Sequence, residues 1–293
     1  MIVQQRRERL RRLLDGSRLV VAPGAYDALS ARLIEQAGFP ALYITGAGVA
    51  SSRLGLPDIG LATMTEVLEA AKNIVAATSI PVICDVDTGY GNALNLMRTV
   101  KEFERIGVAA IQVEDQITPK RCGHTEGKQL ISKEEMVRKI EAFKQAREDD
   151  NFLLIARTDA VAVYGFDHAI ERAKAYAEAG ADVLFVEAPR TNDELKQIPR
   201  LLKNTPLLVN MVDGGGTPSM TTKELETLGF RIAIFPTTAW MAAIRGVQRA
   251  LGALYENGTS EGYSEHMASF EEMFEVVGLS HYRSLENQFL QTG

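Results

Sequence analysis

Eight short apolar runs recur along the chain. Most of them end at or beside a polar or charged residue and are followed by an amphipathic helical pattern. The runs are residues 19–22, 41–45, 81–85, 109–114, 153–158, 183–187, 207–211 and 232–236. Strands that alternate with helices of roughly 10–15 residues form parallel sheets, and eight such units close into a (β/α)8 barrel. We therefore predict an α/β fold, a (β/α)8 TIM barrel, with its active site at the C-terminal ends of the strands.

The patterns outside the eight units predict extra helices at both ends. The segment around Arg6 and Arg7 is expected to be an amphipathic lead-in helix rather than the apolar core of an export signal. Residues 238–256 predict a long helix that ends near Gly258, and residues 270–277 predict another. Barrels commonly form one domain of roughly 200–250 residues or more, so we expect a single catalytic domain over residues 1–293.

Composition argues against some classes of partner. A net charge of −6 disfavours a nucleic-acid partner, which would need a basic face. The chain has no apolar stretch near the roughly 20 residues that a membrane span requires. The two cysteines, Cys84 and Cys122, lie in different contexts and do not predict a disulfide framework. We therefore expect a cytoplasmic protein that acts on small molecules.

Polar residues at the predicted strand ends should meet at one rim of the barrel. Asp85 and Asp87 follow the third run and, with the strand period of two, point the same way. Glu114 joins them from the next strand, and three carboxylates make a hard oxygen site suited to Mg²⁺, with Mn²⁺ as an alternative. A simpler interpretation is that both aspartates cap the turn beside Gly89 and Gly91. The other residues expected at this rim are Thr45, Arg157, Glu187 and Asn210.

The long connection over residues 115–131 has the length of a lid or binding loop. It contains Cys122, flanked by Lys120, Arg121 and His124, whose positive charge would lower the pKa of the thiol and favour proton transfer. The alternative is an ordinary surface loop with an incidental thiol. One Cys and one His are too few for a zinc site. Cys84, inside an apolar strand, is expected in the core.

Two motifs resemble those of a known family. Lys120-Arg121-Cys122-Gly123-His124 and Asp85-Val86-Asp87-Thr88-Gly89-Tyr90-Gly91, together with Glu114-Asp115-Gln116, are similar to motifs of the isocitrate lyase/phosphoenolpyruvate mutase superfamily. The chain looks like its small members: methylisocitrate lyase, dimethylmalate lyase and carboxyphosphonoenolpyruvate mutase. The resemblance implies a Mg²⁺-dependent barrel that forms a homotetramer, a dimer of dimers, with a helix swapped between paired subunits.

The resemblance also implies roles for individual residues. Asp85 would bind Mg²⁺, while Asp87 and Glu114 would hold its waters. Cys122 would protonate the carbanion that bond cleavage leaves. The other implied catalytic residues are Tyr43, near the reacting hydroxyl, and Arg157 and Glu187. The implied substrate-binding residues are Thr45, Gly46, Ala47, Gly123, His124, Asn210 and Pro236.

Two segments depart from the lyase pattern. Met241 stands where methylisocitrate and dimethylmalate lyases carry Arg, and Trp240-Met241-Ala242-Ala243 resembles the mutase instead. Loss of that Arg removes a bidentate clamp for a carboxylate. The loop over residues 210–218 also looks like the mutase, although Asp213 and Gly216 replace Glu and Lys. Pro236 resembles the lyases rather than the oxaloacetate hydrolases, which carry Ser.

Three functions follow from these observations. The leading hypothesis is a Mg²⁺-dependent carbon–carbon lyase that cleaves a small 2-hydroxy di- or tricarboxylate, of 2-alkylmalate or methylisocitrate type, and releases an α-keto acid such as pyruvate. The alternative is a carboxyphosphonoenolpyruvate phosphorylmutase, which forms a phosphorus–carbon bond. In a third class, a barrel that only binds a keto acid, Cys122 would be dispensable.

Overall fold

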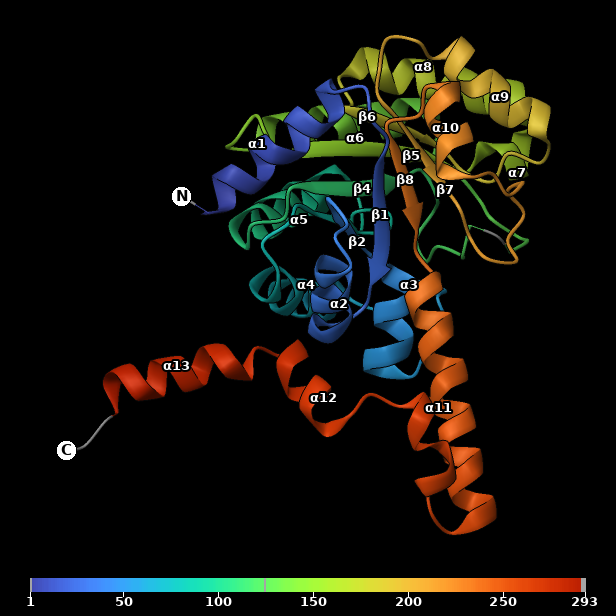
Figure 1. Ribbon diagram of the computed structural model, residues 1–293. Coiled ribbons are helices and arrows are strands. Elements are labelled where there is room, and N and C mark those ends of the chain that lie inside the picture. The colour runs from blue at the N-terminus through green and yellow to red at the C-terminus, as the bar shows by residue number, and fades with distance from the viewer. Residues whose placement is uncertain (1, 124, 291–293) are drawn as a thin grey trace. The chain divides into compact units, whose positions relative to one another are not determined.

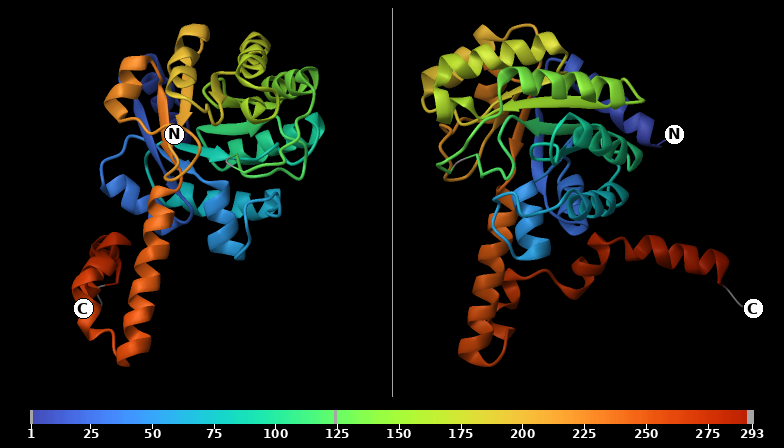
Figure 2. Two further views of the ribbon diagram at one scale, coloured as in Figure 1. Left: turned by 90° about the vertical axis from the view of Figure 1, so that its right-hand side faces the viewer. Right: turned by 180° about the vertical axis from the view of Figure 1, so that it is seen from behind.

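The computed structural model describes residues 2–123 and 125–290. These form two compact units, which divide between Thr238 and Ala239. The first unit is a closed barrel of parallel strands in sequential order, visible in Figure 1 and from two further sides in Figure 2. Its strands are β1 Val20–Ala25, β2 Leu42–Ile44, β3 Val82–Asp85, β4 Ala110–Glu114, β5 Leu153–Thr158, β6 Val183–Val186, β7 Leu207–Asn210 and β8 Ile232–Phe235. The predicted (β/α)8 barrel is confirmed.

Helices between the strands cover the outside of the barrel (Figure 1). After the lead-in helix α1 (Ile2–Asp15), they are α2 Ala28–Gln36, α4 Met64–Ala77, α5 Ala93–Arg105, α6 Lys133–Ala146, α8 Phe166–Ala179, α9 Asn192–Leu201 and α10 Thr222–Leu228. Short helical segments also follow two strands: α3 Gly46–Val49 and the π-helix η1 Ala50–Leu54 after β2, and α7 Ala160–Tyr164 after β5. The sequence patterns did not predict these short segments, because fewer than two turns show no clear helical period.

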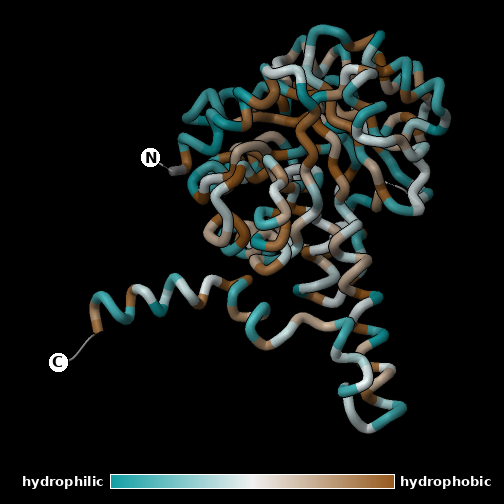
Figure 3. Tube along the Cα trace, in the orientation of Figure 1, coloured by the Kyte–Doolittle hydropathy of each residue, from teal (hydrophilic) through white to brown (hydrophobic). Residues whose placement is uncertain are grey.

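Alternating residues of each strand face the barrel interior and the surrounding helices. In β5, Leu153 and Ile155 belong to the inner cluster, whereas Leu154 and Ala156 belong to the outer core beneath the helices. Figure 3 shows how the hydrophobic colour follows the strands. Cys84 is fully buried in the outer core, as predicted. Because the inner residues step by two, the next inward position of β5 is Arg157, at the C-terminal end of the strand.

The same step places polar residues at the mouth of the barrel on neighbouring strands. Ile83 is followed inward by Asp85, Ala110 by Gln112 and Glu114, and Phe185 by Glu187. Parallel register then aligns them, since Asp85 pairs with Gln112 and Glu114 pairs with Arg157. An apolar interior capped by a polar rim follows directly from strand period and register.

Helix α1 closes the opposite end of the barrel. Leu10 and Leu14 are buried in the inner cluster. Arg7, only 5 % exposed, donates from Nε to the carbonyl of Val108 at 3.1 Å and from Nη1 to Asp149 at 3.1 Å. The predicted lead-in helix is therefore a plug whose charged side chains bond to the loops that precede the strands.

The second unit follows the start of α11 (Thr238–Asn257) and contains η2 (Glu261–His266), α12 (Phe270–Val276) and α13 (Leu279–Phe289). The predicted helices over 238–256 and 270–277 correspond to α11 and α12, whereas α13 was not predicted. No residue of α11, α12 or α13, all within the described part of the chain, is buried. The expectation of one domain over residues 1–293 stays a prediction. Across residues 2–123 and 125–290, no helix combines the length and apolarity needed to cross a bilayer.

Candidate active site

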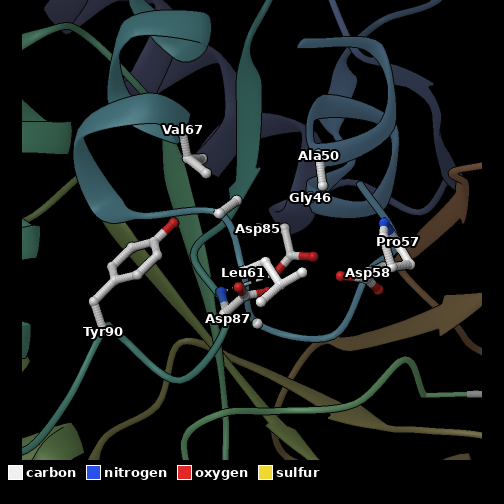
Figure 4. A pocket seen from close by; sticks show the side chains of 11 residues that line it. Gly46, Ala50, Pro57, Asp58, Leu61, Val67, Asp85, Asp87 and Tyr90 are labelled. Atoms are coloured by element: carbon white, nitrogen blue, oxygen red, sulfur yellow. Dashed lines mark hydrogen bonds between the residues drawn. The ribbon is translucent and has the colours of Figure 1, made fainter. Parts of the chain in front are cut away.

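The turn that follows β3 brings two predicted metal ligands together. A Cβ atom on Gly46 would lie 2.9 Å from Asp85 Oδ2 and 3.6 Å from Asp87 Oδ1, so both carboxylates face the same glycine. Figure 4 shows them in a small pocket with Asp58. Its lining consists of Gly46, Ala50, Pro57, Asp58, Gly60, Leu61, Ala62, Val67, Asp85, Asp87 and Tyr90. A side chain at position 46 would have to displace the Asp85 carboxylate from this place.

The backbone of this turn is strained. Asp87 and Tyr90 have positive φ angles of 49° and 61°, a region that residues other than glycine rarely adopt. Ala188, which follows Glu187 after β6, also has a positive φ of 52°. Such strain persists only where the surrounding structure enforces it, and it concentrates at functional sites. Both locations lie at the same rim of the barrel.

Lys120 places a positive charge within the acidic cluster. Its Nζ lies 3.0 Å from Asp87 Oδ1 and also pairs with Asp58, and the side chain is only 5 % exposed. Burial alone would lower the pKa of Lys120, but Asp87 and Glu114 raise the pKa well above its usual value. The sequence pattern paired Lys120 with Cys122; the structure shows that its ion pairs are with carboxylates of the pocket.

A chain of hydrogen bonds connects Asp85 with Tyr43 inside the barrel. The Tyr43 hydroxyl donates to Gln112 Oε1 at 2.6 Å, and Gln112 Nε2 donates to Asp85 Oδ1 at 3.2 Å. Burial and the neighbouring Asp87 raise the pKa of Asp85 to about 6. Burial also raises the pKa of Tyr43 well above its usual value, so its hydroxyl remains protonated. Gln112 was not predicted as a site residue, although it is the polar residue inside an otherwise apolar run.

Arg157 is the centre of a second cluster at the same rim. Its Nε and Nη2 donate to the two oxygens of Asp159 at 2.9 and 3.0 Å. Nη1 lies 3.3 Å from Glu187 Oε2, and Nε lies 3.5 Å from Glu114 Oε2. Asn210 Nδ2 donates to Glu187 Oε2 at 3.1 Å. The guanidinium is therefore already bound on two sides by protein carboxylates.

The loop over residues 115–131 covers this second cluster. A Cβ atom on Gly123 would lie 2.3 Å from Arg157 Nη2 and 3.0 Å from Glu187 Cγ, so the loop backbone touches both side chains. The base of the loop is held by a pair of backbone hydrogen bonds, Ile117 to Gln129 at 2.8 Å and Ile131 to Asp115 at 2.9 Å. Cys122, next to Gly123, is half-buried. The residue His124 lies outside the described residues.

The remaining predicted binding residues lie at the ends of β2 and β8. Thr45 caps α3 by accepting the Gly48 N–H at 3.3 Å, which places Gly46 and Ala47 in the first turn of that helix. Pro236 lies after β8 against the backbone of Gly24, where an added Cβ would come within 2.2 Å of the Pro236 carbonyl oxygen. The roles assigned to these residues stay predictions.

The donor set fits a magnesium ion that is held partly through water. Among the described side chains, Glu114 Oε1 is a buried oxygen that accepts no hydrogen bond, whereas Asp87 Oδ1 is buried and makes the ion pair with Lys120. Within residues 2–123 and 125–290, no three His, Cys, Asp or Glu side chains are close enough to bind a metal by themselves, and Glu114 is turned towards Arg157. Mg²⁺ usually takes one or two carboxylates and keeps several waters, so it does not need a closed protein cage.

Sequence reasoning missed the residues that orient the predicted ones. Asp58 and Lys128 lie in loops and belong to no strand-end pattern, and Asp159 lies one residue beyond the predicted run 153–158. Their partners are buried: Lys120 for Asp58, Arg157 for Asp159, and Asp159 for Lys128 at 3.6 Å. A charged residue directly after a strand, as Asp159 is, was the one available signal.

The chain is similar over nearly its whole length to curated enzymes. It is 46 % identical to 2,3-dimethylmalate lyase of Eubacterium barkeri, with 96 % of this chain and 97 % of the relative covered. It is 41 % identical to a 2-methylisocitrate lyase of Halalkalibacterium halodurans, with coverages of 97 % and 94 %. Identity to a chloroplastic carboxyvinyl-carboxyphosphonate phosphorylmutase of Arabidopsis thaliana is 44 %, with coverages of 96 % and 84 %.

A solved structure supports the same relationship. A phosphonopyruvate hydrolase in complex with oxalate and Mg²⁺ superposes with a TM-score of 0.89 at 32 % identity, with 98 % of this chain and 99 % of that chain covered. The phosphoenolpyruvate phosphomutase family matches residues 10–255. The fold, the acidic turn after β3 and these similarities agree, and the chain belongs to the phosphoenolpyruvate mutase/isocitrate lyase superfamily.

Proposed function

We propose that this protein is a Mg²⁺-dependent carbon–carbon lyase that cleaves a small 2-hydroxy di- or tricarboxylate, of 2-alkylmalate or methylisocitrate type, and releases an α-keto acid such as pyruvate. One observation carries the proposal. The acidic pocket at Asp85 and Asp87 shares a rim with the Arg157–Glu187–Asn210 cluster, and the Cys122-bearing loop touches that cluster through Gly123. The similarity to 2,3-dimethylmalate lyase and 2-methylisocitrate lyase supports the same reaction class.

Asp85, Asp87 and Glu114 would hold Mg²⁺, with Mn²⁺ as an alternative. When bound, the ion would supply Lewis-acid stabilisation of negative charge on the substrate's hydroxyl and carboxylate oxygens. These carboxylates are suited to this because, in the part of the chain that the structure describes, Glu114 Oε1 is buried and accepts no hydrogen bond, and the Asp85 and Asp87 carboxylates both face Gly46. The structural similarity to a phosphonopyruvate hydrolase in complex with oxalate and Mg²⁺ supports magnesium as the cofactor.

Several groups of the chain would bind and orient the substrate. The backbone of Thr45, Gly46 and Ala47 would receive a substrate carboxylate at the start of α3. Tyr43 keeps its proton and is oriented by Gln112, so it would serve as a neutral partner near the reacting hydroxyl. Two of the Arg157 nitrogens are engaged by Asp159, so Arg157 would act mainly by fixing Glu187 and by positive charge.

The reaction requires a base that accepts the proton of the substrate hydroxyl and an acid that protonates the carbon of the other fragment. Removal of the hydroxyl proton yields an alkoxide; its collapse to a ketone breaks the neighbouring carbon–carbon bond and leaves a carbanion on the other fragment. Cys122 would protonate that carbanion, because a thiol is a far stronger acid than a hydroxyl. The loop that covers the site would exclude water from it.

The direct test is incubation of the protein and Mg²⁺ with a panel of 2-alkylmalates, methylisocitrate and oxaloacetate, followed by detection of the released keto acid. We expect pyruvate from at least one 2-hydroxy acid and loss of activity with EDTA. Keto acid binding without turnover of any substrate in the panel would contradict a lyase and favour a barrel that only binds a keto acid.

Replacement of the thiol tests the proposed acid. We expect Cys122→Ser to bind pyruvate normally and to turn over at least ~10²-fold more slowly, because the serine hydroxyl is a much weaker acid. Cys84→Ser, in the outer core, controls for loss of a thiol as such. Unchanged lyase turnover in Cys122→Ser would exclude the thiol as the acid.

A carboxyphosphonoenolpyruvate phosphorylmutase remains the second candidate. Its specific support is the 44 % identity to the plant phosphorylmutase, together with Met241 in place of the lyase Arg. A phosphorus NMR assay on carboxyphosphonoenolpyruvate would detect the new phosphorus–carbon bond directly. No carbanion needs a proton in that reaction, so Cys122→Ser should lose less of it. Phosphonate product in the absence of keto acid release would put this function first.

The second unit supports assembly with further copies of the chain. Met241, Ile244, Leu251 and Leu254 recur at helical spacing along α11 and are between 43 % and 59 % exposed. Apolar faces of this kind are normally covered by another chain. We propose a homotetramer, a dimer of dimers in which a helix of this unit is exchanged between paired subunits, located in the cytoplasm. Light scattering coupled to size exclusion should give the mass of four chains, and a monomer at micromolar concentration would contradict it.

A further inference from the structure

We propose that Lys128 and Asp159 form a positioning pair that docks the loop bearing Cys122 onto Arg157. Neither residue lines the acidic pocket, and neither is the predicted general acid, Cys122. The pair rests on the proposed function only in that Cys122 is taken as the acid that must be placed. The contacts themselves do not depend on that function: the buried ammonium group of Lys128 connects the loop to the carboxylate of Asp159, which orients Arg157.

Asp159 is placed to orient Arg157 rather than to cap a helix. It occupies the N-cap position of α7, yet its side chain makes no capping hydrogen bond and both oxygens accept from Arg157 instead. Its own backbone N–H donates to Asp115 Oδ1 at 2.9 Å, so the position of the carboxylate is fixed at the base of the loop. Asp159 is 1 % exposed, and two parallel bonds define the plane of the guanidinium.

Lys128 connects this carboxylate with the loop tip. Its side chain is only 3 % exposed, and Nζ lies 3.6 Å from Asp159 Oδ1. The same Nζ donates to the backbone carbonyl of Gly123, the residue after Cys122. One ammonium group thus binds the barrel on one side and the loop backbone beside the thiol on the other.

Gly123 makes the contact sensitive to small displacements. A Cβ atom at this position would lie 2.3 Å from Arg157 Nη2, which shows that the loop backbone lies directly on the guanidinium. A change in the plane of Arg157 therefore displaces the loop, and release of the loop frees one face of Arg157. The orientation of Arg157 and the docked position of Cys122 are coupled through Asp159 and Lys128.

The coupling predicts what loss of the charge would do. A neutral side chain at 128 would leave the Gly123 carbonyl without its ammonium donor and Asp159 with one cation fewer. Both losses disfavour the docked loop. A buried acceptor without a donor is destabilising, and undocking would expose that acceptor to water, which can donate to it instead. Arg at 128 would keep a positive charge and a donor, so it should restore docking in part.

The alkylation rate of Cys122 measures docking without any need for turnover. We would treat the full-length protein with iodoacetamide and follow labelling of the Cys122 peptide by mass spectrometry, using the fully buried Cys84 as an internal reference. Lys128→Met should raise the Cys122 labelling rate at least ~10-fold, and Lys128→Arg should lie much closer to the wild type. Lys133→Met, which removes the exposed ion pair between Lys133 of α6 and Glu171 of α8, is the matched control and should label like the wild type.

Asp159→Asn provides a second variant should Lys128→Met fail to fold, and it should raise the labelling rate in the same direction. A folded Lys128→Met protein that labels at the wild-type rate would overturn the proposal. Equal labelling of the Arg and Met variants would overturn it too, because charge would then have no role. If the wild type cleaves none of the tested substrates, the proposed lyase function fails while the labelling result still decides the pair. If cleavage is found but labelling is unchanged, the pair alone fails.

Discussion

The two ends of the barrel carry the same kinds of charged residue in opposite environments. At the end closed by α1, the acids have several donors: partly buried Glu35 accepts from Thr78 Oγ1 at 2.7 Å and from the Ser79 backbone at 3.1 Å, and buried Glu104 accepts from the backbone of Glu148 and Asp149 at 3.0 and 2.7 Å. At the opposite rim, Glu114 Oε1 is a buried oxygen without a hydrogen bond in the described part of the chain, and Asp87 Oδ1 makes an ion pair with Lys120. The carboxylates at the end closed by α1 are hydrogen-bonded, whereas the rim has a carboxylate oxygen that could still accept a hydrogen bond or bind a cation.

The pKa values follow this difference. Burial opposes ionisation at both ends, but hydrogen bonds from Ser79 and Thr78 lower the pKa of Glu35, and bonds from Asn151 and Arg7 lower that of Asp149. At the rim, burial and Asp87 raise the pKa of Asp85 to about 6, and burial raises that of Glu114 despite Arg157. Acids with lowered pKa values stabilise the fold when ionised, whereas acids with raised values cost stability and are available to a ligand.

The largest expected effect is that of Asp85→Asn, an isosteric change at the rim that should affect turnover and stability in opposite directions. Asp85→Asn should reduce Mg²⁺-dependent turnover by at least ~10²-fold, because it removes the charge that holds the ion. The same variant should raise the metal-free unfolding free energy by about 1–3 kcal/mol at pH 7.5. That gain should disappear as the pH falls below about 6, where the wild-type carboxyl is itself protonated.

Asp149→Asn is the comparator for this experiment, since it should lower the unfolding free energy in EDTA by roughly 0.5–1 kcal/mol and leave turnover unchanged. Urea unfolding and steady-state assays measure both variants. A destabilised Asp85→Asn protein would mean that Asp85 is a structural residue, and the contrast between the two ends would not hold there.

The second effect belongs to stability alone. Arg7→Met should lower the unfolding free energy by about 2–4 kcal/mol, because it removes the bonds to Val108, Asp149 and Glu104 and leaves buried acceptors unpaired. Turnover per folded molecule should be unchanged, since the site lies at the opposite end of the strands. Arg9→Met, at an exposed position on the same helix, is the control and should shift stability by less than ~0.5 kcal/mol. A large loss of turnover in folded Arg7→Met would mean that the two ends are coupled.

The smallest effect is a pH dependence at the closed end. Glu35 has a lowered pKa when folded, so its contribution is present above the unfolded pKa of about 4.3 and is lost as the pH falls through the folded value. Glu35→Gln should therefore be less stable than the wild type at pH 7 by about 0.5–1 kcal/mol and equal to it in strong acid. Urea titrations at a series of pH values would show the two curves converge; parallel curves would assign the loss to geometry rather than charge.

Much of the site could be predicted because it follows from strand period. The inner residues of β5 are Leu153, Ile155 and Arg157, and a reader of the sequence needs only the run and its end to place Arg157 at the rim. The same reasoning placed Asp85 and Glu114. It failed for the partners of these residues, because the short helices after β2 and β5 carry no pattern of their own. It also misjudged one strand end, since β1 extends to Ala25, beyond the predicted 19–22.

The sequence by itself determined the barrel, because eight apolar runs with helical segments between them leave few ways to bury both faces of a parallel sheet. It also determined which polar residues reach the mouth. Only the tertiary structure decided how those residues pair: Lys120 forms ion pairs with Asp58 and Asp87, and Arg157 donates two hydrogen bonds to Asp159. Those choices depend on distances between loops far apart in the chain, and on the burial that strengthens each charge, and neither is encoded in local periodicity.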